Sequence, residues 1–420
     1  MPHPAQALAD PIRDALLSAS GDCPDSVVQR ALRAVRSHLG LQVAYVSEIV
    51  GSESVFRSVD APGLEHLIKP GDTRSLDDVY CRHILEGRLP QLIPDTAAEP
   101  LAMAMPITTA VPIGAHVSVP LRMADGHIYG MFCCLGPHAD PSLNLRDLSM
   151  MRAFAELAAF EIDRERSLAQ ARRDITDRIG RIVANQSMRI VYQPIWNMEG
   201  TRPIGFECLA RFPDLPVRSP DKWFAEAAES GMAIDLELAA IRAALAALTV
   251  LPDDVYLAVN ASPSTALHPR LAALLAGYPL DRVVLEITEH DCVEDFEALT
   301  LAIAPLRAQG LRLAVDDAGA GYCGLQQILQ MRPDLIKLDR SLIQDIGTDP
   351  SRRALAAALT MFARETGSRI VAEGVETEAE LAMLRALGVH TVQGYLLGRP
   401  ASLGKALAQV SRTGPSLAAV

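Results

Sequence analysis

The second half of the chain alternates short apolar runs with helical patterns, and this alternation limits the folds that it can adopt. Eight strand-like runs follow residue 189, at residues 190–195, 203–212, 255–259, 283–287, 311–315, 335–338, 370–372 and 391–396. Helical patterns lie between most of them, for example at 220–248, 351–366 and 378–387. This order predicts an α/β fold, a TIM-like barrel of strands inside a ring of helices. Only a short segment around residues 196–201 joins the first two runs, so the barrel should begin with an antiparallel strand.

Acidic and amide side chains collect where these strands end. The set, which includes one lysine, is Glu207, Asn260, Glu286, Asp316, Asp317, Lys337, Asp339, Glu373 and Gln393. The carboxyl ends of barrel strands converge on one face, and carboxylates gathered there repel each other unless cations neutralise them. Oxygen ligands without His or Cys favour Mg²⁺ or Mn²⁺ over zinc. Any single residue of the set could instead be a solvated strand end, and an isolated Asp-Asp pair is more often a helix cap.

Composition and charge exclude several classes of protein. The 420 residues carry a formal charge of −12, which argues against a surface that binds nucleic-acid phosphates. With 49% hydrophobic and 21% charged residues, the chain resembles a globular protein of two or three domains. No apolar run reaches the roughly 18 residues that span a bilayer, and no export signal is apparent. Seven scattered cysteines without a C-x-x-C pair predict reduced thiols. We therefore expect a cytoplasmic protein without a membrane or nucleic-acid partner.

The first 165 residues combine helical patterns with an antiparallel sheet. Two amphipathic patterns span about residues 7–40, with Asp25 a possible cap, and strand-like runs occupy 43–50, 91–96, 115–123 and 127–135. A helix is expected over 75–86. The order of elements over about residues 20–165 resembles the GAF family of sensor domains, which implies an α+β domain that binds an unidentified small molecule. Cys81 and His83 could form a bilin attachment site, but a Cys one turn into a helix is more often part of the core.

Residues 145–182 form one long helical pattern that leads into the second half, with residues 166–186 expected to connect the two domains. Apolar residues recur at Leu148, Met151, Phe154, Ala158 and Ile162, and then at Leu168, Ile175, Ile179 and Ile182. The first set fits a helix packed on its own domain. The second set is close to a heptad repeat and is expected to be exposed in a monomer. A parallel contact between two such helices predicts a homodimer, which would give the sensor a route to the second domain.

Eight short motifs occur in order in the second half. They are Tyr192-Gln-Pro-Ile195, Glu207-Cys-Leu-Ala-Arg211, Val259-Asn-Ala-Ser262, Glu286-Ile-Thr-Glu289, Asp316-Asp317, Lys337-Leu-Asp339, Ala372-Glu-Gly-Val-Glu376 and Gln393-Gly-Tyr395. Together they resemble the EAL family of cyclic-di-GMP phosphodiesterases. The resemblance covers about residues 187–410, which predicts an EAL domain over 187–411 and a tail at 412–420.

The resemblance implies a role for each of these residues. One cation would be held by Glu207, Asn260, Glu286 and Asp316. Asp316 would bridge to a second cation, positioned by Asp317, Asp339 and Glu373. Lys337 would lie near the attacking water as proton acceptor or charge stabiliser, and Glu289 would anchor the loop after Asp317. Lys337, Glu373 and Glu289 are thus the expected catalytic residues. The dinucleotide would contact Gln193, Leu209, Arg211, Glu376 and Gln393.

The expected reaction is hydrolysis of cyclic-di-GMP to linear pGpG with two Mg²⁺ or Mn²⁺ ions. Cys208 replaces the alanine of the family's name motif, which is a small change. Ala318, Ala320 and Cys323-Gly324 replace the family's Phe, Thr and Ser-Ser, so we expect reduced activity that depends on the first domain. The main alternative is a receptor that binds cyclic-di-GMP without cleaving it and signals through a protein partner. A different metal-dependent barrel enzyme would require the ordered motifs to be accidental.

Overall fold

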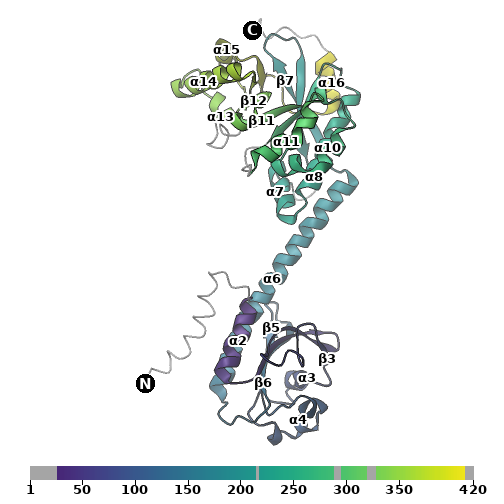
Figure 1. Ribbon diagram of the computed structural model, residues 1–420, viewed down its shortest axis with the longest axis vertical. Helices are drawn as coiled ribbons and strands as arrows, with labels where there is room; N and C mark the ends of the chain where they lie inside the picture. The colour runs from purple at the N-terminus through teal and green to yellow at the C-terminus, as the bar shows by residue number, and fades with distance from the viewer. Residues whose placement is uncertain (1–25, 214–216, 288–294, 319–327, 412–420) are drawn as a thin grey trace. The chain divides into compact units, whose positions relative to one another are not determined.

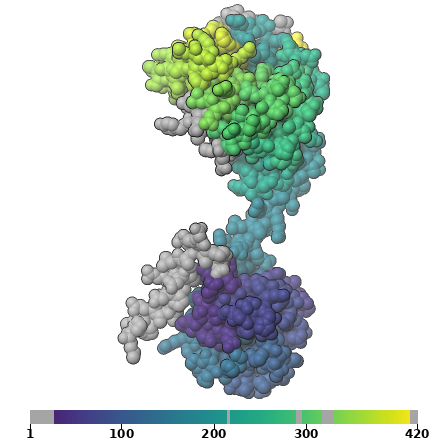
Figure 2. Space-filling view, in the orientation of Figure 1, coloured from purple at the N-terminus to yellow at the C-terminus, as the bar shows by residue number. Residues whose placement is uncertain are grey.

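The computed structural model describes residues 26–213, 217–287, 295–318 and 328–411 of the chain. It divides into two compact units, Met1–Ala171 and Arg172–Val420. Helix α6 (Leu145–Asn185) begins in the first unit and ends in the second (Figure 1). Each unit has its own core of buried hydrophobic side chains, and Figure 2 shows the surface of each unit. Among the described residues, no helix has the length and apolar character needed to cross a membrane. The boundaries predicted from sequence at residues 165 and 186 stay a prediction.

The first unit is built on a six-stranded antiparallel sheet. Its strands, in the spatial order β3-β2-β1-β6-β5-β4, are β3 (Thr73–Ser75), β2 (Glu53–Asp60), β1 (Val43–Val50), β6 (Ile128–Gly136), β5 (Ala115–Arg122) and β4 (Leu92–Ile93). Helix α2 (Val27–Leu39) and the first part of α6 cover one face. The other face packs against α3 (Tyr80–Leu85) and residues around α4 (Pro100–Ala104) and α5 (Pro106–Ala110). This is the α+β domain expected from the sequence.

Strand alternation assigns the neighbouring cysteines of β6 to opposite faces. Cys134 lies in the core beneath α2 and α6, whereas Cys133 packs with Cys81 on the other face. Cys81 is 1% exposed and belongs to the hydrophobic core, as the more common interpretation of a helical Cys predicts. The described cysteines, which also include Cys208, are free thiols.

Three local predictions for this unit need correction. Strand β2 forms in a segment where no strand is predicted from the sequence, because Val55 and Phe56 pair with β1 and Phe56 joins the core. The helix expected over 75–86 begins only at Tyr80, since Thr73–Ser75 pairs with β2. Helix α2 is capped by Ser26, whose side chain accepts from the Gln29 amide. Asp25, the predicted cap, lies outside the described residues.

The apolar stripe in the second half of α6 is mostly buried, contrary to the prediction from the sequence. Ile179 is 0% and Ile182 is 1% exposed, because both pack with Trp223 in a core cluster of the second unit. Only Leu168 of that stripe is well exposed, at 60%. The prediction that the whole stripe is exposed in a monomer is therefore wrong. The predicted homodimer loses that argument and stays a prediction.

The second unit is a closed barrel of eight strands, as the sequence predicts. The strands are β7 (Arg189–Asn197), β8 (Pro203–Arg211), β9 (Tyr256–Ala261), β10 (Val283–Ile287), β11 (Arg312–Ala318), β12 (Leu335–Leu338), β13 (Arg369–Ala372) and β14 (Thr391–Gln393). Strand β7 runs antiparallel to both of its neighbours, β8 and β14, and the other neighbouring pairs are parallel. The antiparallel first strand of the prediction is thus confirmed.

Helices pack around the barrel strands (Figure 1). They are α7 (Pro220–Ser230), α8 (Ala233–Leu245), α9 (Pro263–Leu267), α10 (Pro269–Leu275), α11 (Phe296–Arg307), α13 (Arg340–Ile343), α14 (Pro350–Thr366), α15 (Glu378–Ala386) and α16 (Leu403–Ser411). The pattern at 220–248 is not one helix, because Gly231 adopts φ +80° and ends α7. A left-handed residue at this position stops a helix, and glycine adopts it without steric cost.

Side chains of the barrel strands alternate between two cores, one between the strands and the helices and one inside the barrel. Residues such as Leu285, Leu313 and Ile336 face outward and pack in the large core that includes the helices. A smaller cluster fills the interior, with Tyr256 among its members. Gly205 leaves room for it, because a Cβ there would lie 2.6 Å from the Tyr256 ring.

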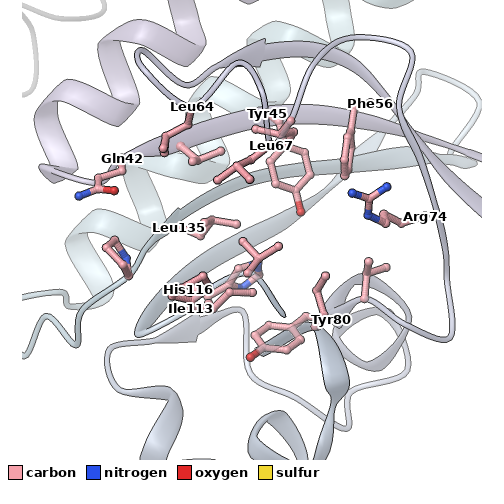
Figure 3. Close-up of a pocket in the computed structure, with 17 residues that line it drawn as sticks. Gln42, Tyr45, Phe56, Leu64, Leu67, Arg74, Tyr80, Ile113, His116 and Leu135 are labelled. Carbon is pink, nitrogen blue, oxygen red and sulfur yellow. The ribbon is translucent and has the colours of Figure 1, made fainter. Parts of the chain in front are cut away.

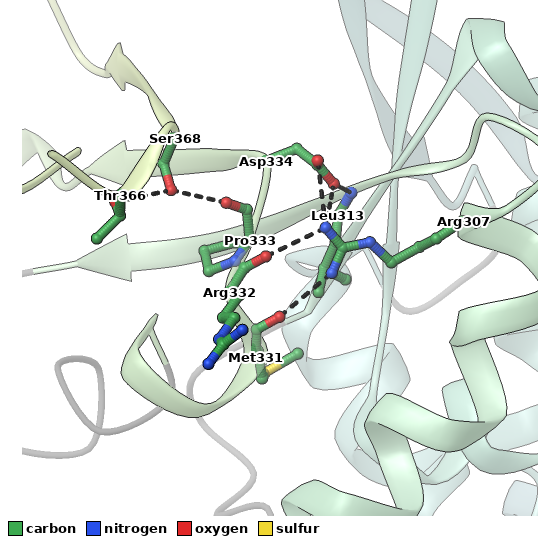
Figure 4. Close-up of polar contacts among 8 residues, drawn as sticks. All are labelled: Arg307, Leu313, Met331, Arg332, Pro333, Asp334, Thr366 and Ser368. Carbon is green, nitrogen blue, oxygen red and sulfur yellow. Dashed lines mark hydrogen bonds and ion pairs between the residues drawn. The ribbon is translucent and has the colours of Figure 1, made fainter. Parts of the chain in front are cut away.

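A group of polar contacts fixes the amino-terminal ends of β11 and β12. Asp334, just before β12, accepts hydrogen bonds from the Leu313 amide at 2.8 Å and from Arg307 of α11 at 3.1 and 3.2 Å (Figure 4). Arg307 also donates to the carbonyl oxygens of Met331 and Arg332. These contacts hold the strands in register at the end of the barrel opposite to the strand carboxyl ends, where contacts serve stability.

Candidate active site

Four of the predicted site residues lie on the inner face of the barrel, each two positions beyond an interior apolar residue. These pairs are Val284 and Glu286 on β10, Ala314 and Asp316 on β11, Leu335 and Lys337 on β12, and Val371 and Glu373 at the end of β13. Because side chains alternate along a strand, residues two apart share a face. The period-two pattern therefore brings the charged side chains to the carboxyl ends of neighbouring strands.

Four carboxylates converge on the ammonium group of Lys337. The distances from Nζ are 2.7 Å to Glu373 Oε1, 2.9 Å to Glu286 Oε2, 3.1 Å to Asp316 Oδ1 and 3.7 Å to Glu207 Oε1. Lys337 is 1% and Glu286 2% exposed. Since these contacts join residues from four strands and the end of a fifth, the cluster exists only when the barrel is closed.

The electrostatics of the cluster follow from burial and from its excess of negative charge. Burial raises the pKa of Glu286 to about 8, against the opposing effect of Lys337 and with a further increase from Glu207 and Asp316. Burial likewise raises the pKa of Glu373. Burial alone would lower the pKa of Lys337, but the carboxylates, first of all Asp316, raise it well above its usual value. In the form without cations, Lys337 is therefore an ammonium among partly protonated acids.

Amide side chains border the carboxylates. Gln393, at the end of β14, donates from Nε2 to Glu207 Oε2 at 2.5 Å. Asn260 on β9 pairs in register with Glu286 on β10, and Gln193 on β7 pairs in register with Glu207 on β8. Gln193 also donates to the Gly398 carbonyl oxygen at 3.5 Å. The rim thus offers neutral oxygen ligands and hydrogen-bond donors beside the acids.

Other predicted residues have local partners. Asp339 accepts from the Ser341 amide at 2.8 Å and caps α13. Glu376 forms an ion pair with Arg340 at 3.0 Å. The sequence pattern does not single out Arg340, whose only signal is its place directly after the Lys337-Leu-Asp339 motif. It packs across Gly374, where a Cβ would lie 2.4 Å from Arg340 Cγ.

The remaining predicted residues lie near the end of β8 or outside the residues that the structure describes. Leu209 is half-buried near the end of β8, and Arg211 is exposed, with its Nη1 donating to the Ala210 carbonyl oxygen. Glu289, the side chain of Asp317, and the altered residues Ala320 and Cys323-Gly324 lie outside the described part of the structure.

The donor set of the cluster fits a hard divalent cation. Four carboxylates and one ammonium leave an excess of three negative charges when all are ionised. Uncompensated buried charge is costly, and the raised pKa values of Glu286 and Glu373 follow from it. A divalent cation would relieve this excess, and the ligand atoms are all oxygens. Among the described residues, no three acidic, His or Cys side chains are arranged as a metal site as they stand, and Lys337 Nζ holds the central position.

Comparison with known proteins identifies both domains. The model of the EAL domain family matches residues 172–400, and a GAF domain model matches residues 24–163. The cyclic di-GMP phosphodiesterase RocR of Pseudomonas aeruginosa is 30% identical over 315 residues, which cover 69% of this chain and 77% of RocR. PdeA of Escherichia coli, described as a probable cyclic di-GMP phosphodiesterase, is 33% identical over 53% of this chain and 32% of PdeA. For PdeA and two other relatives the match spans only 28–32% of their length.

Solved structures resemble the barrel. A structure of the MucR phosphodiesterase in complex with c-di-GMP aligns with a TM-score of 0.50 at 26% identity, covering 55% of this chain and 99% of that one. An EAL enzyme bound to cAMP and cyclic-di-GMP aligns over 88% of this chain and 93% of that one with a TM-score of 0.54; at 18% identity this likeness concerns the fold alone. The chain therefore belongs to the EAL domain family and carries an N-terminal GAF domain.

Proposed function

We propose that this chain hydrolyses cyclic-di-GMP to linear pGpG with the help of Mg²⁺ or Mn²⁺. The observation that carries the proposal is the convergence of four carboxylates on Lys337 at the mouth of the barrel. RocR, described as a cyclic di-GMP phosphodiesterase, matches this chain over 77% of its own length, and this supports the choice of substrate.

Two cations would be held by the oxygen atoms of the rim. Glu207, Asn260, Glu286 and Asp316 would bind the first, and Asp317, Asp339 and Glu373 would help to hold the second. Bound in this way, the cations would polarise the phosphodiester and activate the attacking water. Gln393 would orient Glu207 through the hydrogen bond that it already donates.

Lys337 serves best as a charge stabiliser. Its acidic neighbours keep Nζ protonated in the form without cations, and an ammonium can donate hydrogen bonds to phosphate oxygens. Its four contacts fix its position before substrate arrives, which lowers the reorganisation needed in the reaction. The proton-acceptor role that the sequence leaves open is less favoured, because it would require the loss of that proton first.

The pocket for the dinucleotide would extend over Gln193, Leu209, Arg211 and Glu376. Arg211 lies at the end of β8 with an exposed guanidinium that can bind a phosphate, and Arg340 holds Glu376 in place. We further propose that the GAF domain regulates turnover. A homodimer and a cytoplasmic location remain predictions.

The test is a turnover assay with purified full chain, cyclic-di-GMP and either Mg²⁺ or Mn²⁺, in which pGpG is separated by chromatography. We expect turnover by the wild type that chelation abolishes. Glu207→Gln should lower the rate by at least two orders of magnitude, because it removes an anionic ligand while keeping the side-chain size. Glu229→Gln, at an exposed residue of α7, is the matched control and should keep the wild-type rate.

Two results would contradict the proposal. Tight binding of cyclic-di-GMP without any pGpG would establish the alternative, a receptor that signals through a protein partner. Near-normal turnover by Glu207→Gln would show that the first cation is held elsewhere.

A further inference from the structure

A cavity of about 220 Å³ lies in the GAF domain, between the sheet and the segments around α3 and α5 (Figure 3). Seventeen residues line it, and twelve of them are aliphatic, proline or phenylalanine. Two ring pairs also line it: Tyr45 with Phe56, whose centroids are 4.8 Å apart, and Tyr80 with His116, at 5.0 Å. An apolar cavity with aromatic walls favours a ligand that presents a flat, apolar surface.

The few polar groups of the cavity are cationic or neutral, and none of the lining residues is acidic. Arg74 is exposed and lines the cavity, and the Tyr45 hydroxyl points inward (Figure 3). His116 is 2% exposed, and its Nδ1 has no hydrogen-bond partner among the described residues. A buried polar atom without a partner costs free energy, which a ligand can recover by supplying the missing hydrogen bond. The polar groups therefore select a ligand with hydrogen-bonding oxygen atoms and negative charge.

The volume limits the size of the ligand. Since one water in the liquid takes about 30 Å³, the cavity has room for a molecule on the order of ten heavy atoms. A cyclic nucleotide, a bilin or a haem would have to extend beyond this space into the solvent. Arg74 is also the one lining residue with a permanent positive charge, which matches a ligand that carries a single negative charge.

We propose that the GAF cavity binds a small aromatic carboxylic acid. The ring lies among Tyr45, Phe56 and Tyr80, the carboxylate pairs with Arg74, and His116 Nδ1 gains a hydrogen-bond partner. This assignment does not depend on the chemistry of the barrel, because it concerns a separate site and is tested by binding rather than by turnover.

The experiment compares phenylacetate with phenylacetamide, a neutral molecule of the same shape. Calorimetric titration of the full chain should give tighter binding of phenylacetate. Arg74→Ala should weaken phenylacetate binding roughly tenfold, the effect of losing one partly exposed charge-assisted hydrogen bond, and leave phenylacetamide unchanged. Arg122→Ala removes another exposed arginine of the same domain that does not line the cavity, so it should bind as the wild type does.

A second variant tests the location independently of charge. Leu67 lines the cavity but is 48% exposed, so Leu67→Trp can fill the space without disturbing a buried core position. It should abolish binding of both probes while the melting temperature stays within a few degrees of the wild type. The proposal is overturned if neither probe binds at millimolar concentration, if the amide binds as tightly as the acid, or if Leu67→Trp binds normally. Binding of cyclic GMP in preference to phenylacetate would also overturn it.

Discussion

Replacing Lys337 by methionine tests the electrostatic account of the barrel most directly. The change keeps an unbranched side chain that is one atom shorter, and it removes the ammonium on which Glu373, Glu286, Asp316 and Glu207 converge. Lys337 is 1% exposed, so water cannot take its place without rearrangement of the site. The variant leaves four acidic groups around an uncharged side chain.

The expected loss of stability depends on pH. Removing one partner of a buried ion pair costs about 3–5 kcal/mol, because the remaining charge is left uncompensated. Without the ammonium the carboxylates hold protons to higher pH than in the unfolded chain, where Glu titrates at about 4.3. A group with a raised folded pKa stabilises the fold at low pH, and this stabilisation is lost as the pH rises through that value. The loss should therefore be about 1–3 kcal/mol smaller near pH 5.5 than near pH 8.

The measurement is urea denaturation in the presence of a chelator, followed by tryptophan fluorescence. The two tryptophans, Trp196 and Trp223, both lie in the second unit, so the signal reports on the barrel and not on the GAF domain. Lys405→Met, at an exposed lysine of α16, is the control and should change the free energy of unfolding by less than about 0.5 kcal/mol. Added Mg²⁺ should stabilise Lys337→Met more than the wild type. A loss below about 1 kcal/mol, or one that is equal at both pH values, would refute the reasoning.

Two further outcomes follow from the same contacts. The affinity for Mg²⁺ without substrate should increase as the pH rises from about 6 to about 8, because Glu286, with its pKa raised to about 8, must release a proton before it can bind a cation. Calorimetry in buffers of different ionisation enthalpy measures this proton release. An affinity for Mg²⁺ that does not depend on pH would contradict the prediction. Ile179→Ala should destabilise the barrel by about 2–4 kcal/mol, since Ile179 is buried beside Trp223, whereas Leu168→Ala at a 60% exposed position should cost less than about 0.5 kcal/mol. The fluorescence assay above measures the first loss, and urea denaturation followed by far-UV circular dichroism, which reports on both units, measures the second. Equal effects would show that α6 is not packed on the barrel in solution.

Local patterns were sufficient to predict the barrel. Period-two apolar runs give the eight strands, and the short segment between 195 and 203 requires the antiparallel start of β7 and β8. The same period predicts that Glu286 and Asp316 emerge at strand ends on one face. Predictions failed where local signals were weak or competed. The mostly polar β2 depends on its pairing with β1, and Gly231 divides an otherwise helical pattern.

Alternation along a strand is a local property, so the order of residues alone predicts which side chains lie at the strand ends and that oxygen ligands predominate there. Only the closed barrel decided that Lys337 lies at the centre of four carboxylates from different strands, since a sequence carries no distance between strands. Tertiary packing also decided that Ile179 and Ile182 are buried rather than exposed. The GAF cavity also depends on tertiary packing, because residues as distant in sequence as Arg74 and Leu135 line it together.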